Sequence, residues 1–394
     1  MPDLAASHFP RVIAHDPVEP LEFLAHELSE PHRSALRQSQ GRFAVLVENA
    51  GELIWDSSDV LGGLGAVVFP LHQLESDVER FLIASVPPEI SPGLCPLTDM
   101  LRSVMRNHKT REFHWLPRRP ADAARRTLIV GILNTTPDSF SDGGRFEGVT
   151  QALDHARGMI DAGADVIDVG GCSTRPGAAE PSVEEEIRRT VPVIEKLRAS
   201  GTTPISIDTY RAEVARRALD AGADIINDVT ALLHDADMPV LAASRDVPVI
   251  LMHMQGTPRT MQENPHYDDL VAEIYRFLSR AAARAEAAGV RPDRIAIDPG
   301  FGFGKTVEHN LEILRRLHEF RSLGRPVVIG TSRKSAIGKV LDRATEERLM
   351  GTAATVALAA ASGASIVRVH DVSAMHDVVR MTEAVLTGRA SPDA

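Results

Sequence analysis

The chain has 394 residues, of which 43% are hydrophobic and 25% charged, and its formal net charge at pH 7 is −11. This composition is typical of a soluble globular protein. The acidic balance argues against a nucleic-acid-binding protein, which needs a basic face to meet phosphates. The sequence has no run of 18 apolar residues, so no membrane span is predicted.

The two cysteines, Cys95 and Cys172, have no metal-like spacing and are too few for a disulfide scaffold. Their scarcity predicts a reducing compartment. The first residues show no charged segment followed by an apolar one, as a signal peptide would. We therefore predict a cytoplasmic protein without nucleic-acid or membrane partners.

Residues 1–120 differ in character from the remainder, because proline is frequent and both tryptophans, Trp55 and Trp115, lie there. Apolar patterns predict strands at 41–47 and 61–69 and helices at 71–83 and 96–107. We predict a small α+β domain over residues 1–120, ending in a charged linker or surface segment at 118–126. No motif in this region carries chemistry.

A repeated pattern begins after residue 127. The stretch DAGADVIDV at 161–169 recurs as DAGADIINDV at 220–229 and, more loosely, as SGASIVRV at 362–369. Each copy follows an Ala-rich helical pattern and has a glycine (Gly163, Gly222 or Gly363) where the helix should end, since glycine forms a left-handed cap at little cost. The apolar run that follows is short and does not alternate, which is typical of a parallel strand buried on both faces. Each copy is thus predicted to join a helix to a strand.

The same pattern predicts eight strands, separated by amphipathic helices, at 128–133, 166–169, 205–207, 225–226, 247–252, 295–297, 327–329 and 366–369. Eight strand–helix units over residues 127–387 match the length of a (β/α)8 TIM barrel. We predict this fold for a second domain at 121–390. A doubly wound open sheet is the alternative, and the number of units fits it less well.

Polar residues follow every predicted strand at its C-terminal side, which is where TIM barrels build their active sites. Asp208, Asn227 and Asp298 end three strands, and carboxylates with an amide suit a flat heterocycle rich in N–H donors. The alternative is that they only cap the following helices. GTSRKS at 330–335 supplies two cations, and RVHD at 368–371 supplies a cation and an imidazole. These stretches favour an anion such as pyrophosphate, with an internal salt bridge as the alternative.

Seven motifs occur in order at the strand ends: NTTPDSFSDGG, GGCSTRPGA, SIDT, IIND, DPGFGFGK, GTSRKS and RVHDV. Together they resemble the motifs of dihydropteroate synthases, the pterin-binding barrel enzymes of folate biosynthesis. The resemblance covers residues 127–387 and implies a transferase. In the implied reaction p-aminobenzoate displaces pyrophosphate from 6-hydroxymethyl-7,8-dihydropterin pyrophosphate and gives 7,8-dihydropteroate.

The resemblance also implies roles for single residues. Asn134 would hold Mg²⁺ on the pyrophosphate, and Asp208, Lys334 and Arg368 would be catalytic. The pterin would be bound by Asp208, Asn227, Asp298 and Lys334, the pyrophosphate by Arg368, His370 and Arg175, and the aminobenzoate by Thr174, Pro176, Phe303 and Ser332. Cys172 replaces the acidic or amide residue that the family usually has at this place.

The resemblance further implies a homodimer formed through helices late in the barrel, within residues 346–385. Two other functions stay open at this point. Methyltetrahydrofolate–corrinoid methyltransferases share the pterin-binding barrel but lack the cations of SRKS and RVHDV. A pterin-binding paralogue without catalytic activity is the third reading, and the presence of Asn134, Lys334, Arg368 and His370 argues against it.

Overall fold

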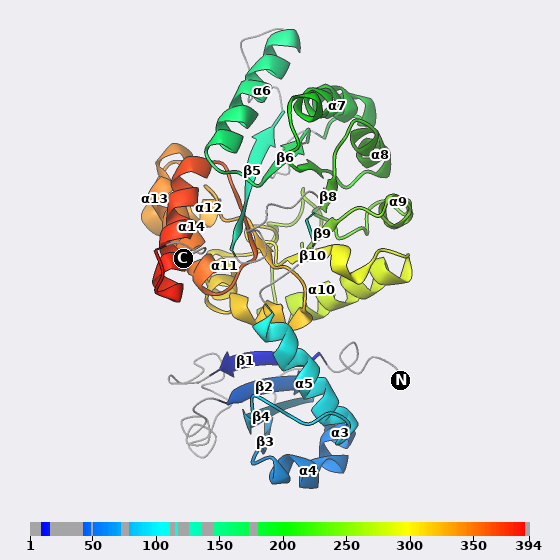
Figure 1. Cartoon of the computed structure of the whole chain (residues 1–394), viewed down its shortest axis with the longest axis vertical. Helices are drawn as coiled ribbons and strands as arrows, with labels where there is room; N and C mark the ends of the chain where they lie inside the picture. The colour runs from blue at the N-terminus through cyan, green and yellow to red at the C-terminus, as the bar shows by residue number, and fades with distance from the viewer. Residues whose placement is uncertain are drawn as a thin grey trace. The chain divides into compact units, whose positions relative to one another are not determined.

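The computed structural model describes residues 9–15, 42–48, 50–71, 79–110, 115–116, 126–135, 145–172 and 180–390. It divides the chain into two compact units (Figure 1). The first comprises Met1–Thr110 and His318–Arg325, and the second comprises Arg111–Leu317 and Pro326–Ala394. Within the described part of the chain, no helix combines the length and apolar character that crossing a bilayer requires.

The described residues of the first unit form an antiparallel sheet and helices. The strand order is β1-β2-β4-β3, and the elements are β1 (Arg11–His15), β2 (Phe43–Glu48), α3 (Gly51–Asp56), α4 (Ser58–Gly63), β3 (Val67–Leu71), β4 (Arg80–Val86) and α5 (Pro96–Lys109). The α+β class, the strand near 41–47 and the helix near 96–107 agree with the sequence analysis. The helix predicted at 71–83 is wrong in its described part, because Arg80 begins strand β4.

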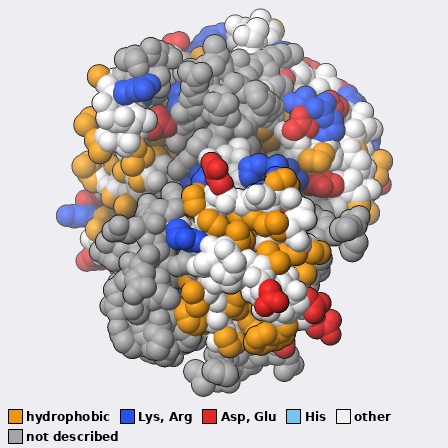
Figure 2. Space-filling model, turned by 60° about the horizontal axis from the view of Figure 1, so that its bottom comes forward, with side chains coloured by type: hydrophobic (Ala, Val, Ile, Leu, Met, Phe, Trp, Pro, Cys, Tyr) orange, Lys and Arg blue, Asp and Glu red, His pale blue; other side chains and the backbone are white. Residues whose placement is uncertain are grey.

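Strand β2 is buried on both faces, which explains its unbroken apolar run. Phe43, Val45 and Val47 pack with the helices of the unit, and Ala44 and Leu46 pack in a second cluster on the opposite face. The exposed surface of this unit includes Trp55, Val67 and Leu94. Figure 2 shows hydrophobic side chains gathered on the face that it turns forward.

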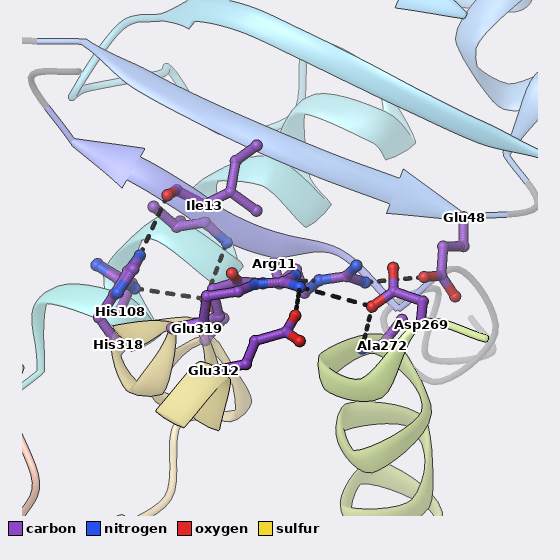
Figure 3. A network of polar contacts seen from close by, with 12 residues as sticks. Arg11, Ile13, Glu48, His108, Asp269, Ala272, Glu312, His318 and Glu319 are labelled. Carbon is purple, nitrogen blue, oxygen red and sulfur yellow. Dashed lines mark hydrogen bonds and ion pairs between the residues drawn. The ribbon is translucent and has the colours of Figure 1, made fainter. Parts of the chain in front are cut away.

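A buried ion pair holds His318–Arg325 in the first unit, although this segment lies between two barrel strands in the sequence. Arg11 donates through Nη1 to Glu48 at 2.8 Å and through Nε to Glu319 at 3.0 Å, and all three side chains are fully buried. His318 Nε2 lies 3.1 Å from the Ile13 carbonyl oxygen (Figure 3). Val12 N–H donates to Ser322 Oγ at 3.0 Å. A sequence pattern does not reveal such long-range pairing, so this part of the first unit was not predicted.

The second unit is the predicted barrel. Its eight parallel strands have the order β10-β9-β8-β7-β6-β5-β12-β11, and an isolated bridge between Ile297 and Val327 closes the circle. All eight predicted runs form strands: β5 (Leu128–Asn134), β6 (Val166–Gly170), β7 (Ile205–Asp208), β8 (Ile225–Asp228), β9 (Val249–Met252), β10 (Ile295–Asp298), β11 (Val328–Ile329) and β12 (Ile366–Val369).

Helices surround the strands (Figure 1). They are α6 (Arg145–Asp161), α7 (Val183–Ser200), α8 (Ala212–Asp220), α9 (Met238–Arg245), α10 (Leu270–Ala287), α11 (Val307–Arg315), α12 (Ser335–Leu341), α13 (Leu349–Ala361) and α14 (Val372–Thr387), with short 3-10 turns η3 (Pro292–Arg294), η4 (Leu317–Leu323) and η5 (Thr345–Glu347). Gly163, Gly222 and Gly363 have positive φ at the ends of α6, α8 and α13, as the repeated pattern predicted.

An apolar layer fills the interior of the barrel. It contains Leu128, Val130, Val166, Ile225, Ile250, Ala296, Val328 and Ile366, from seven of the eight strands. Trp115 and Leu116 pack in the same cluster, although the sequence analysis assigned them to the first domain, and the structure divides the chain after Thr110. This layer, which is the apolar floor of the barrel, fills it at that level, and the inward positions that follow it lie toward the C-terminal ends of the strands.

Candidate active site

The candidate site consists of the inward residues one step above the apolar floor. Side chains alternate along a strand, so the residue two positions after an inward apolar residue also points inward. Val166, Ile225, Ala296 and Ile366 belong to the floor, and the positions two residues later are polar: Asp168, Asn227, Asp298 and Arg368. On β7, Asp208 lies at the equivalent position. The sequence therefore changes from apolar to polar at one level inside the barrel.

Arg368 joins two carboxylates of this layer. Its Nε donates to Asp168 Oδ2 at 2.6 Å and its Nη2 donates to Asp208 Oδ2 at 2.7 Å. Asn227 Nδ2 donates to the same Asp168 oxygen at 3.2 Å. The sequence analysis placed Arg368 with the pyrophosphate, with an internal salt bridge as the alternative; in the structure Arg368 forms ion pairs with Asp168 and Asp208, and its role toward a pyrophosphate stays a prediction. It lies among the carboxylates predicted to bind the ring.

Asp168 was not predicted as a site residue. It is fully buried in β6, inside the run DVIDV that the sequence analysis used only to identify a strand. The sequence did contain a feature that could have identified it: Asp168 is the one charged residue in an otherwise apolar strand. An ionised group is rarely buried in such a strand without a partner, so a polar site could have been inferred there.

Asp298 ends β10 and begins the loop that contains Gly300 and Phe303. Its Oδ1 accepts a hydrogen bond from Gly300 N–H at 2.7 Å. Burial raises the pKa of Asp298 to about 6, although this hydrogen bond and the charges of Lys334 and Lys305 act in the opposite direction. Asp298 is therefore ionised at neutral pH and able to accept N–H donors.

The side chains of Lys305 and His253 hold that loop in place through hydrogen bonds. Lys305 Nζ donates to the Phe303 carbonyl oxygen at 2.8 Å and lies 3.0 Å from His253 Nδ1. Both side chains are buried. Burial lowers the pKa of Lys305 to about 7, and burial together with the Lys305 charge lowers the pKa of His253 well below its usual value. The pair thus carries little charge above neutral pH and serves to place Phe303.

Lys334 lies against the ring of Phe303. Lys334 Nζ lies 4.0 Å from the centre of the Phe303 ring, within the range of a cation–π contact. Burial and the nearby Arg368 lower the pKa of Lys334 to about 8. The ammonium is still the main form at pH 7.

Of the two cations of GTSRKS, Lys334 contacts the Phe303 ring and Arg333 does not. Arg333 forms a two-bond ion pair with Asp371, and its φ of +56° turns it away from the direction of Lys334. Ser332 Oγ lies 3.0 Å from His370 Nδ1 and accepts the His370 N–H at 3.2 Å. Burial and the charges of Arg368 and Arg333 lower the pKa of His370 to about 4, so this imidazole is neutral at pH 7.

Asn134 ends β5 next to Asp208. A Cβ atom at Gly170 would lie 3.7 Å from Asp208 Oδ2 and 3.8 Å from Asn134 Oδ1, so these two oxygens face the same space beside Gly170. Thr174, Arg175 and Pro176 lie outside the described residues, as does most of the NTTPDSFSDGG loop. Among the residues that the structure describes, no three His, Cys, Asp or Glu side chains are grouped to hold a metal ion.

Cys172, the departure from the family pattern, lines a cavity of about 410 Å³ formed by loops that follow β6 to β9. Burial, and secondly the charge of Glu186, raise the pKa of its thiol to about 11. It is therefore protonated at neutral pH. Tyr210 and Glu180 line the same cavity and share a hydrogen bond of 2.6 Å.

Comparison with known proteins agrees with this arrangement. Residues 130–370 match the family model of pterin binding enzymes. The chain is 49% identical to the dihydropteroate synthase of Synechocystis sp. over 265 residues, which are 67% of this chain and 92% of that protein. The Escherichia coli K12 dihydropteroate synthase is also 49% identical, over 66% of this chain and 92% of its own length.

Solved structures are similar over the same region. The Xanthomonas albilineans dihydropteroate synthase with 4-aminobenzoic acid has a TM-score of 0.63 and 47% identity, and covers 66% of this chain and 94% of its own. Another structure of that protein holds 7,8-dihydropteroate and has a TM-score of 0.61 with 44% identity over the same shares. The Yersinia pestis dihydropteroate synthase with a sulfonamide complex has a TM-score of 0.64 and 45% identity, over 66% and 95%.

Proposed function

The chain belongs to the dihydropteroate synthase family of pterin-binding enzymes, and from this premise we propose that it condenses 6-hydroxymethyl-7,8-dihydropterin pyrophosphate with p-aminobenzoate. The observation that carries the proposal is the polar layer above the barrel floor, where Asp208, Asn227, Asp298 and Arg368 meet. In the reaction the amine nitrogen forms a bond to the pterin methylene carbon as the bond from that carbon to the pyrophosphate oxygen breaks. The amine proton leaves to solvent, and the products are 7,8-dihydropteroate and pyrophosphate.

The ring is proposed to lie on the polar layer. Asp298 and Asn227 supply acceptors for its N–H groups, and Lys334 supplies a donor for its carbonyl oxygen or ring nitrogen. Asp208 lies at the same level. Burial raises the pKa of this carboxyl above its usual range, while the Arg368 guanidinium opposes that shift. A cationic pterin methylene develops as pyrophosphate departs, and the ionised Asp208 would stabilise this positive charge.

The pyrophosphate is proposed to bind above the ring, near Lys334, Arg368 and His370, with Arg175 joining from outside the described residues. The neutral imidazole of His370 would contribute a hydrogen bond and no charge. Phe303 and Ser332, with Thr174 and Pro176, would form the aminobenzoate pocket. An aromatic amine is nucleophilic as it stands, so no general base is required to activate it.

Mg²⁺ fits this site as an ion that accompanies the substrate. The Asn134 amide oxygen is a hard ligand of the kind that Mg²⁺ prefers. Mg²⁺ commonly takes one or two protein oxygens and completes its shell with phosphate oxygens and water. When bound, the ion would offset negative charge on the leaving pyrophosphate.

Steady-state release of pyrophosphate tests the proposed function. We expect release only when both substrates are present, with kcat/KM highest between about pH 7 and pH 8. As the pH falls below this range, Asp208 gains a proton first and Asp298 next, so the site loses the carboxylates that face the ring; above it Lys334 loses its charge. The kcat profile should extend to lower pH, because bound N–H donors stabilise the Asp298 carboxylate.

Two outcomes would contradict the proposal. Tight pterin binding without pyrophosphate release would support a non-catalytic paralogue. Methyl transfer from methyltetrahydrofolate to a corrinoid would support the methyltransferase alternative, which the comparisons do not favour.

A homodimer through the last two helices is proposed because apolar side chains lie exposed there. Met350 is 76% exposed on α13, and Met381 and Val385 are 65% and 69% exposed on α14. Large exposed apolar surfaces are uncommon on monomers, so this exposure favours an interface. We expect sedimentation velocity at micromolar concentration to give a dimer for the wild type and a monomer for Val385→Asp. Val240→Asp, at an equally exposed position on α9, is the matched control and should stay dimeric. A monomeric wild type would refute the dimer.

The cytoplasm stays the predicted location. This proposal rests on the small number of cysteines, Cys95 and Cys172, in the chain.

A further inference from the structure

We propose that Asp168 is a positioning residue that sets the hydrogen-bonding direction of the pterin site. Its carboxylate fixes which atom of Asn227 faces the ring and limits how strongly Arg368 neutralises Asp208. This inference rests on the proposed function, since it assigns the ring to the polar layer.

The burial of Asp168 shows that it is costly to keep. The side chain is fully buried. Among the residues that the structure describes, Oδ1 has no hydrogen-bond partner, and neither has the hydroxyl of Ser206, which is its register partner on β7. A buried carboxylate with one unsatisfied oxygen destabilises a fold. Because Asp168 does not stabilise the fold, its role lies with the two residues that donate to its Oδ2, Arg368 and Asn227.

The bond to Asn227 decides the orientation of an amide. An ionised carboxylate only accepts hydrogen bonds, so the Asn227 atom that contacts it must be Nδ2. The amide oxygen then points away from Asp168 and is available as an acceptor. A neutral side chain at position 168 removes this constraint, because the Asn227 amide can then turn and present its N–H groups to the ring.

The bond to Arg368 decides how strongly Asp208 is neutralised. Arg368 shares its donors between Asp168 and Asp208. Its Nε donates to Asp168 Oδ2 at 2.6 Å, and its Nη2 lies 2.6 Å from the same oxygen and 2.7 Å from Asp208 Oδ2. Without the carboxylate at 168, the guanidinium is free to form a two-bond pair with Asp208, which is the geometry that Arg and carboxylates prefer. Asp208 would then have less negative charge to offer to the developing cation. Loss of Asp168 should thus affect both binding of the ring and the chemical step.

The first test compares Asp168→Asn with Asp165→Asn. Asp165 is a matched control, because it is a buried aspartate just before β6 that forms a two-bond ion pair with Arg126, at the opposite end of the strand. We expect Asp168→Asn to raise the KM for the pterin pyrophosphate at least about tenfold and to lower kcat, with the KM for p-aminobenzoate changed less than about twofold. Asp165→Asn should lower thermal stability and leave both KM values unchanged.

The second test exchanges the two groups. In Asp168→Asn combined with Asn227→Asp, the new asparagine donates to the new aspartate, whose other oxygen again presents an acceptor to the ring. We expect kcat/KM of the double variant to exceed that of either single variant by about tenfold. A role in folding alone would not produce this rescue.

The Kd of a pterin for each variant, measured by titration calorimetry, tests the orientation of Asn227 whether or not turnover occurs. An inactive wild type would contradict the proposed function. An active wild type with unchanged kinetics and pterin Kd in Asp168→Asn, or a double variant no better than the single ones, would overturn the role of Asp168.

Discussion

Replacing Arg368 by glutamine is expected to lower kcat/KM by about a thousandfold, the upper range for removing one charge-stabilising donor from an active site. The guanidinium links Asp168 and Asp208 across the barrel. Its loss leaves two neighbouring carboxylates in the polar layer without a cation between them, so one of them takes up a proton at neutral pH. A protonated Asp208 cannot stabilise the positive pterin methylene, and the pyrophosphate loses a cation as well.

Two further variants show whether the geometry or the charge is responsible. Arg368→Lys keeps one positive charge but has no planar fork that reaches two carboxylates, so it should recover only part of the activity. Arg198→Gln is the matched control, since Arg198 also pairs with a strand-flanking aspartate, Asp224, outside the polar layer, and we expect its kcat/KM within about twofold of the wild type. Activity of Arg368→Gln within tenfold of the wild type would contradict the assigned role.

The barrel could be predicted from the sequence because each of its strands follows simple local rules. A glycine at the helix end, a short apolar run and a polar strand end recur in DAGADVIDV and DAGADIINDV, and Gly163 and Gly222 have the positive φ that the pattern requires. The positions of Asp208, Asn227 and Asp298 at the ends of three strands followed from the same pattern. These features depend on residues that are only a few positions apart in the sequence, so a local sequence pattern is enough to predict them.

Partners across the barrel could not be predicted in this way. Arg333 and Lys334 are adjacent cations in the sequence, but the left-handed backbone at Arg333 directs it to Asp371 and leaves Lys334 against Phe303. Arg368 and Asp168 are 200 residues apart and meet only because β12 and β6 flank β5. Strand β4 was mistaken for a helix in part because its buried residues do not alternate with polar ones.

Replacing Gly300 by alanine is expected to disable the loop that carries Phe303 and to lower kcat/KM about a hundredfold, the effect of misplacing a binding group by about 1 Å. Gly300 has a φ of +72°, where an L side chain costs about 1–2 kcal/mol. Its Cβ would also lie 1.8 Å from the His253 carbonyl oxygen, a distance that no atom pair tolerates. The backbone must move, and both the Gly300 N–H bond to Asp298 and the Phe303 N–H bond to the Gly300 carbonyl oxygen move with it.

Gly158→Ala is the matched control for this change. Gly158 is an exposed residue of α6, and a Cβ there meets no atom within 4 Å. Alanine in a helix interior is more stable than glycine by about 0.5–1 kcal/mol, so this variant should unfold at a slightly higher denaturant concentration and keep full activity. Gly300→Ala should unfold at a lower concentration, with a higher KM for both substrates, because the turn supports Asp298 on one side and Phe303 on the other. If Gly300→Ala instead kept wild-type KM values, the loop would not be the element that holds Asp298 and Phe303 in place.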